Sequence, residues 1–227
     1  MLIIKDRMHV DPDIILKFAA FLLALCAHEF SHGWVANKLG DPTARLMGRL
    51  TLNPFAHADP IGTFVLPIMG LLTNASLIGW AKPVPVNSRN LKNEKMGMFW
   101  VALAGPGCNI ILAIIGSLIF GGLVRFFETA SFFHMTLELT KTFVAINLVL
   151  AIFNLIPMHP LDGGKVFAIF LPDHINRKLE EMQFAFMITM MVLFVASDIG
   201  SYIIGRPVAI LMELFLKTGL RIFGIHL

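Results

Sequence analysis

The chain has 227 residues, of which 56% are hydrophobic and 15% are charged, and its mean hydropathy is +0.75. Soluble domains carry charge on about a quarter of their residues, so this composition excludes an ordinary water-soluble domain and indicates that lipid surrounds much of the chain. The net charge of +3 is modest and the basic residues gather in loops, which argues against a nucleic-acid-binding surface. We expect one integral-membrane domain over residues 1–227, with a core over 14–170 and peripheral C-terminal helices over 183–227.

Apolar stretches predict the membrane-spanning elements. A hydrocarbon core of about 30 Å needs about 20 apolar residues, and four stretches meet this length: 14–36, 98–124, 142–160 and 183–204. The stretch 61–80 is interrupted by Pro67, Gly70 and Asn74, which suits a re-entrant segment. The stretch 207–225 carries one polar stripe of Glu213, Lys217 and Arg221, so we expect an interfacial or bundle-packed helix.

Turn-forming residues punctuate the chain between Gly40 and Pro60, and short alternating pieces lie between them, which is typical of a small hairpin or a turn-rich sheet. We therefore predict an all-α polytopic membrane protein with about five to six transmembrane helices. A small membrane-associated β-hairpin or re-entrant region would accompany them.

The first apolar stretch contains the sequence His28-Glu29-Phe30-Ser31-His32. On a helix, histidines four residues apart lie on one face, so both imidazoles can reach one metal ion while Glu29 stays beside them. Ionisable groups at bilayer depth cost roughly 2.5–3.5 kcal/mol each, so they usually mark a site. A structural alternative has the histidines hydrogen-bonded across helices and Glu29 paired with a buried cation.

A second polar cluster, Asn154 to Gly164, ends the 142–160 stretch. Pro157 and Pro160 must end or kink the helix, and two glycines allow a tight turn after Asp162. A hydrolytic zinc site needs three protein ligands and one open position. The first helix supplies two ligands, and Asp162 is the most plausible third.

These motifs together resemble the site-2 protease family of intramembrane zinc metalloproteases. The similarity extends from about Ala20 to Phe167 and includes the sequences Gly105-Pro106-Gly107-Cys108-Asn109, Asn154-x-x-Pro157-x-x-x-Leu161-Asp162-Gly163-Gly164, 53–62 and 79–87. The last two resemble the compact subgroup that lacks PDZ and CBS domains. His159 departs from the family pattern, which usually has proline at that position.

The resemblance implies a function and assigns roles to residues. His28, His32 and Asp162 would hold Zn²⁺, Glu29 would be the general base, and Asn154 would assist the reacting carbonyl. The expected activity is hydrolysis, by metal-activated water, of peptide bonds within or near transmembrane segments of membrane proteins. The alternative is a non-proteolytic zinc-binding membrane protein or a metal transporter, although a transporter would need a polar track to both faces.

Three other polar residues have two interpretations each. Asn109 could orient a ligand, although the small residues before it more often permit close helix packing. His57 could line a substrate path or satisfy backbone groups in a turn. His159 could be a neighbour of the site or a surface residue.

The loop charges predict the topology. Residues 82–95 hold Lys82, Arg89, Lys92 and Lys95 against Glu94 alone, which places this segment in the cytoplasm. We expect a multi-pass protein of the cell (inner) membrane whose active site lies toward the cytoplasm. Asp162 and the two histidines can then meet only if 61–80 enters and leaves on one face. The expected partners are the bilayer and transmembrane protein substrates, with no nucleic acid, and the sequence identifies neither an adaptor nor a homo-oligomer.

Overall fold

The computed structural model describes residues 12–65, 68–69, 80–130 and 133–226, and within these ranges the chain is helical and contains no strand. Three helices are long and apolar enough to cross a membrane: α1 (Pro12–Lys38), α5 (Glu94–Phe126) and α6 (Phe133–Asn154). They correspond to three of the predicted stretches. The third begins earlier than predicted and ends at Asn154, because Pro157 has no N–H with which to continue the helix.

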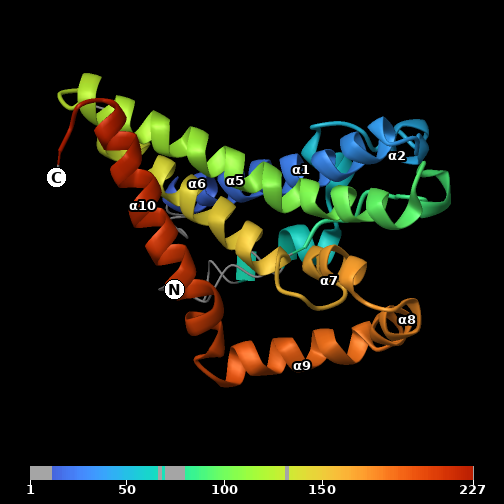
Figure 1. The fold of residues 1–227 in the computed structure, drawn as a ribbon. Coiled ribbons are helices and arrows are strands. Elements are labelled where there is room, and N and C mark those ends of the chain that lie inside the picture. Colours follow the sequence, from blue (N-terminus) through green and yellow to red (C-terminus); the bar gives the residue numbers. More distant parts are fainter. Residues whose placement is uncertain (1–11, 66–67, 70–79, 131–132, 227) are drawn as a thin grey trace, which may run out of the picture.

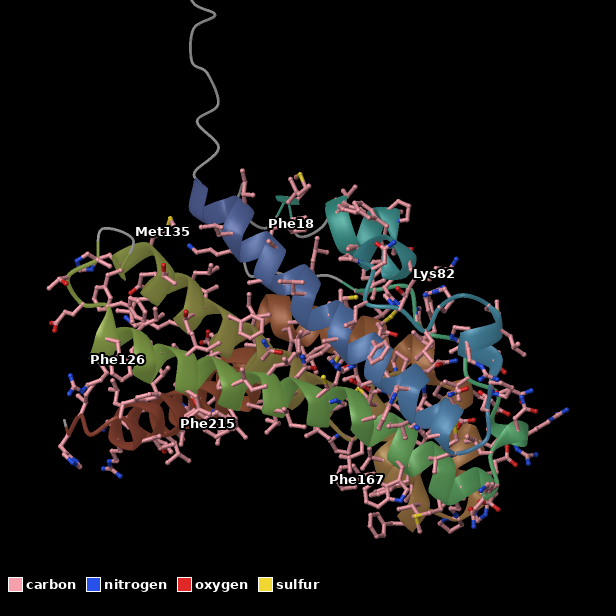
Figure 2. The ribbon with its side chains drawn as sticks, turned by 90° about the horizontal axis from the view of Figure 1, so that it is seen from above. Phe18, Lys82, Phe126, Met135, Phe167 and Phe215 are labelled. Atoms are coloured by element: carbon pink, nitrogen blue, oxygen red, sulfur yellow. The ribbon has the colours of Figure 1, made fainter. Side chains whose placement is uncertain are left out.

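Helix α5 is the centre of the packing. It contacts α1, α6 and α10 (Arg206–Ile222), and α1 also packs on α6 (Figure 1). Figure 2 shows that α1 and α5 run close together at the end that carries α2 (Thr43–Leu46), whereas Phe126 marks the opposite end of α5. Asn93 caps α5 by accepting a hydrogen bond from the Met96 backbone N–H at 2.9 Å.

Helix α10 is packed against the bundle, as the polar stripe of 207–225 allowed. A Cβ atom on Gly219 would lie 2.0 Å from the Ser117 carbonyl oxygen, and one on Gly121 would lie 2.3 Å from the Gly219 oxygen. The backbones of α5 and α10 therefore touch without intervening side chains. The opposite face carries the exposed pair Glu213–Lys217, with 2.6 Å between carboxylate and ammonium.

The predicted count of five to six spans is not reproduced by the described residues, in which three helices qualify. The stretch 183–204 forms α9 (Gln183–Ala196) and the π-helical turn η4 (Ser201–Gly205). Fourteen helical residues rise about 21 Å, which is short of a hydrocarbon core of about 30 Å. The stretch 61–80 begins in η1 (Pro60–Val65), but 66–67 and 70–79 lie outside the described residues.

The prediction of a hairpin between Gly40 and Pro60 is wrong. This segment forms two four-residue helices, α2 and α3 (Pro54–His57). The Asn53 side chain accepts a hydrogen bond from the Phe55 N–H at 3.1 Å, directly before a proline at the first helical position. Such local side-chain bonds start helical turns and compete with the backbone pairing that a hairpin requires.

Asp41 connects the end of α1 with the segment before α5. Its carboxylate is fully buried and accepts hydrogen bonds from the backbone N–H groups of Thr43 (3.1 Å) and Asn87 (2.7 Å). The Thr43 hydroxyl and the Asn90 amide, which lies in η2 (Ser88–Asn90), also donate to it. Burial would raise the pKa of Asp41, but these hydrogen bonds outweigh burial and hold the pKa below its usual value.

The lowered pKa of Asp41 predicts a pH-dependent stability. The contribution of the ionised Asp41 carboxylate to the unfolding free energy is fully present above the unfolded-state pKa of about 3.9. It is lost as pH falls through the lower pKa of the folded state. We expect Asp41→Asn to reduce the unfolding free energy in detergent by about 1.5–3 kcal/mol at neutral pH, and by much less in acid. Denaturation at both pH values measures this effect. Asp173→Asn is the control, because its surface pair with Lys95 is 88% exposed on the carboxylate side; an equal loss in both variants would contradict the assignment.

Candidate metal centre

The two histidines of α1 lie side by side in the bundle. His28 and His32 are four residues apart, their ring centroids are 4.7 Å apart, and both side chains are buried. This is the helical geometry predicted from the spacing. Both rings turn toward α5 and toward α7 (Asp162–Phe167).

Asp162 meets both histidines through one oxygen atom. Its Oδ2 atom lies 3.1 Å from Nε2 of His28 and 3.2 Å from Nε2 of His32. Burial would raise the pKa of Asp162, but its interactions with the two histidines outweigh burial and lower the pKa. The structure thus brings Asp162 into contact with His28, from which the sequence separates it by 134 residues, and with the neighbouring His32.

Asp162 reaches the histidines because the chain after α6 turns tightly. Pro157 follows the end of α6, and α7 begins at Asp162 itself. A Cβ atom on Gly163 would lie 2.2 Å from the Ile156 carbonyl oxygen, and one on Gly164 would lie 2.8 Å from the His159 nitrogen. The two glycines are therefore required by close backbone approach, since any side chain would push α7 away from the preceding loop.

The Nδ1 atom of each imidazole has a hydrogen-bond partner. Nδ1 of His32 lies 2.7 Å from the Val101 carbonyl oxygen, which can only accept, and Nδ1 of His28 lies 2.5 Å from Oδ1 of Asn109. When Nδ1 carries the proton of a neutral imidazole, Nε2 presents a lone pair. Two lone pairs would then point at one carboxylate oxygen, an arrangement that requires a positive charge between them.

A metal ion fits this requirement. Protonation of the imidazoles would also supply positive charge, but two imidazole nitrogens and one carboxylate are the donor set of hydrolytic zinc sites, which keep a fourth position open. The outer Nδ1 hydrogen bonds also match the arrangement that orients metal-bound histidines. His28, His32 and Asp162 are therefore suited to hold one zinc ion.

Glu29 lies beside the same cluster. The potential ligand atoms of His28, Glu29 and His32 all lie within 4.8 Å of one another. Oε2 of Glu29 accepts a hydrogen bond from the Val84 N–H at 2.9 Å. The extended segment before α5 thus fixes the carboxylate at the edge of the cluster, where it can exchange a proton with a neighbouring water molecule.

The other predicted polar residues lie in different surroundings. The Asn154 amide donates to the Leu150 carbonyl oxygen of its own helix at 2.9 Å, so its contact in this structure is local. Nε2 of His57 lies 2.8 Å from the Thr51 oxygen, in keeping with its interpretation as a turn residue. Nε2 of His159 lies 3.1 Å from Oδ1 of Asn176, on α8 (Asp173–Glu181).

Several groups near the centre were missed by the sequence interpretation. The Val84 N–H and the Val101 carbonyl are backbone groups and carry no sequence signal. Asn147 lies on α6, is fully buried and bonds to Asn109. The rule that marked His28, that polar groups at membrane depth have a reason, would also have marked Asn147.

Gly105 gives the histidines their space. A Cβ atom there would lie 2.4 Å from Nε2 of His32 and 2.6 Å from Cε1 of His28, whereas nothing lies within 4 Å of a Cβ atom on Gly107. We expect Gly105→Ala to lower zinc affinity by about tenfold or more, because a ligand ring must move. Gly107→Ala, on the same helix, should retain the wild-type affinity. Metal analysis of both purified variants measures this, and equal zinc retention in the two would contradict the geometry.

Comparison with known proteins agrees with zinc as the metal. Residues 117–197 match the sequence model of Peptidase family M50, and this range includes Asp162. The chain is 36% identical over 203 residues to "Putative zinc metalloprotease YwhC" of Bacillus subtilis (strain 168), covering 88% of this chain and 89% of that relative. It is 30% identical over 182 residues to "Putative zinc metalloprotease Rip2" of Mycolicibacterium smegmatis, covering 79% of this chain and 66% of that relative. No solved structure matches the chain. With the identity and coverage of the first relative, this chain belongs to peptidase family M50, the site-2 protease family.

Proposed function

We propose that this protein is a zinc-dependent intramembrane endopeptidase that cuts membrane-protein substrates within or near their transmembrane segments. Membership of a metallopeptidase family makes it a metalloendopeptidase with zinc as its cofactor. The observation that carries the proposal is the position of Asp162 Oδ2, within 3.2 Å of Nε2 of both histidines. One ion in contact with these three atoms would have the ligand set of a hydrolytic zinc site.

The residues around the centre divide the chemical work. Zinc, when bound by His28, His32 and Asp162, polarises a carbonyl and lowers the pKa of water to about 7. Glu29 would take a proton from the attacking water and pass it to the leaving amine, and its hydrogen bond from Val84 holds it beside the histidines for this role.

Asn154 would assist the reacting carbonyl. Its amide now donates to Leu150 within its own helix, so the side chain would rotate to reach the substrate. Its place near the end of α6, a short loop before Asp162, supports this role.

The three spanning helices support a location in the membrane. A peptide bond in a transmembrane helix is already hydrogen-bonded, so a substrate would have to unwind locally before cleavage. The bilayer and single-span or multi-span membrane proteins are the expected partners. We further propose that residues 1–227 act as one domain with its core in 14–170, because α1, α5 and α6 all pack against one another.

The cytoplasmic side is the proposed position of the active site, in the cell (inner) membrane. Lys82, Arg89, Lys92 and Lys95 outnumber Glu94 in the segment before α5. The bonds of Asp41 to Asn87 and Asn90 join the end of α1 to this segment, so the chain between them starts and finishes on one side. This supports a stretch 61–80 that enters and leaves on one face.

Removal of the general base tests the chemistry. We expect Glu29→Gln to lower cleavage of a single-span model substrate by roughly 10²–10⁴-fold while zinc content is unchanged, because the base is not a ligand. A purified assay with metal analysis measures both quantities. Glu138→Gln is the matched control, since this glutamate pairs on the surface with Lys141. Cleavage by Glu29→Gln at the wild-type rate would refute the assignment, and zinc transport without cleavage would favour a transporter.

Cysteine labelling tests the topology. In a variant without Cys26 and Cys108, we expect a membrane-impermeant maleimide to label Ser88→Cys from the cytoplasmic face, because this residue lies in the basic segment. Lys5→Cys should be labelled from the opposite face or at the interface. Labelling of both from the cytoplasm, with an active enzyme, would overturn the topology.

A further inference from the structure

We propose that Asn147 and Asn109 form a positioning pair that fixes the tautomer of His28, so that its Nε2 atom is free to hold the metal. Asn147 lies on α6, Asn109 on α5 and His28 on α1, so the pair connects the three spanning helices at one depth. The inference rests on the proposed function in that it takes His28 to be a metal ligand.

A continuous line of hydrogen bonds carries the inference. Nδ2 of Asn147 donates to the Phe143 carbonyl oxygen at 2.9 Å, and Nδ2 of Asn109 donates to Oδ1 of Asn147 at 2.8 Å. Oδ1 of Asn109 then lies 2.5 Å from Nδ1 of His28. Both asparagine side chains are fully buried, so water cannot replace a lost partner without cost.

The line has a direction because a backbone carbonyl can only accept. The Phe143 oxygen therefore requires the NH₂ group of Asn147, which turns the Asn147 oxygen toward α5. That oxygen in turn requires the NH₂ group of Asn109, so the Asn109 oxygen faces His28. The Ala24 carbonyl oxygen, 3.4 Å from Nδ2 of Asn109, favours the same orientation.

An oxygen that faces Nδ1 requires a proton on Nδ1. In a neutral imidazole this leaves the lone pair on Nε2, the atom that lies 3.1 Å from Asp162. Rotation of the Asn109 amide by half a turn would place its NH₂ group against Nδ1 and favour the other tautomer, in which Nε2 carries the proton and cannot bind a metal ion.

The two histidines depend on different kinds of partner. His32 donates directly to the Val101 backbone oxygen, whose identity no substitution changes. His28 depends on two side chains, and the second of them, on α6, touches neither His28 nor Asp162 in any described contact. Asn147 is therefore a positioning residue whose removal should act on His28 from a distance.

The experiment compares three variants of the full chain in detergent, with selectively ¹⁵N-labelled histidine. Asn147→Leu removes both hydrogen bonds, whereas Asn147→Asp keeps an oxygen that faces Asn109. Thr140→Val changes another buried polar residue of α6, two turns away, whose hydroxyl bonds within its own helix. The ¹⁵N shifts of the metal-free protein at alkaline pH report which ring nitrogen of His28 carries the proton, and zinc competition reports the affinity.

We expect the Nδ1–H tautomer of His28 in the wild type, in Asn147→Asp and in Thr140→Val. In Asn147→Leu we expect a mixture of tautomers and zinc affinity lower by about 10- to 100-fold. If Asn147→Leu does not fold, Asn147→Ala takes its place, because a smaller side chain fits the same space. Wild-type tautomer and wild-type affinity in the folded variant would overturn the proposal.

The outcomes also separate this inference from the proposed function. The tautomer is measured without metal, so it tests the asparagine pair even if zinc does not bind at His28. Zinc affinity that is unchanged by His32→Ala would refute the metal centre while leaving the tautomer result valid.

Discussion

One carboxylate oxygen that faces two buried imidazole nitrogens is the constraint on which the rest of this structure depends. With the proton of each imidazole on Nδ1, the two Nε2 lone pairs face the carboxylate oxygen of Asp162, and this arrangement requires a positive charge between them. A zinc ion meets this condition with the ligand types that zinc prefers. Under the proposed function, the bound cation would offset the electrostatic cost of burying these groups together.

Helix α5 supplies the groups that contact the two histidines opposite Asp162. It offers Gly105 where the rings need space, a backbone oxygen at Val101 and an amide at Asn109, all on the surface that packs against α1. These three residues lie about one turn apart along α5, so one face of this helix contacts both histidines. The contacts that pack α1 on α5 therefore also set the orientation of His28 and His32.

The segment between α1 and α5 contacts both the end of α1 and the centre. Asp41 holds this segment to the end of α1 through charge-assisted hydrogen bonds, and the same segment delivers the Val84 N–H to Glu29. The buried carboxylate of Asp41 and that of Glu29, the proposed general base, are thus both bonded to the same connecting segment, although they belong to different clusters.

The sequence by itself determined the features that follow from local rules: the shared face of His28 and His32 from helical periodicity, the end of α6 before Pro157, and the presence of a long apolar helix in each of three predicted stretches. Local rules failed between Gly40 and Pro60, where two short helices formed instead of a hairpin, the second of them capped by the Asn53 side chain. Only the tertiary structure decided which groups surround the histidines. The sequence singled out Asn109 as a residue that could orient a ligand, but only the structure shows that it reaches His28, 81 residues away. Val84 and Val101 act through backbone atoms that every residue type shares, so no pattern along the chain could have marked them.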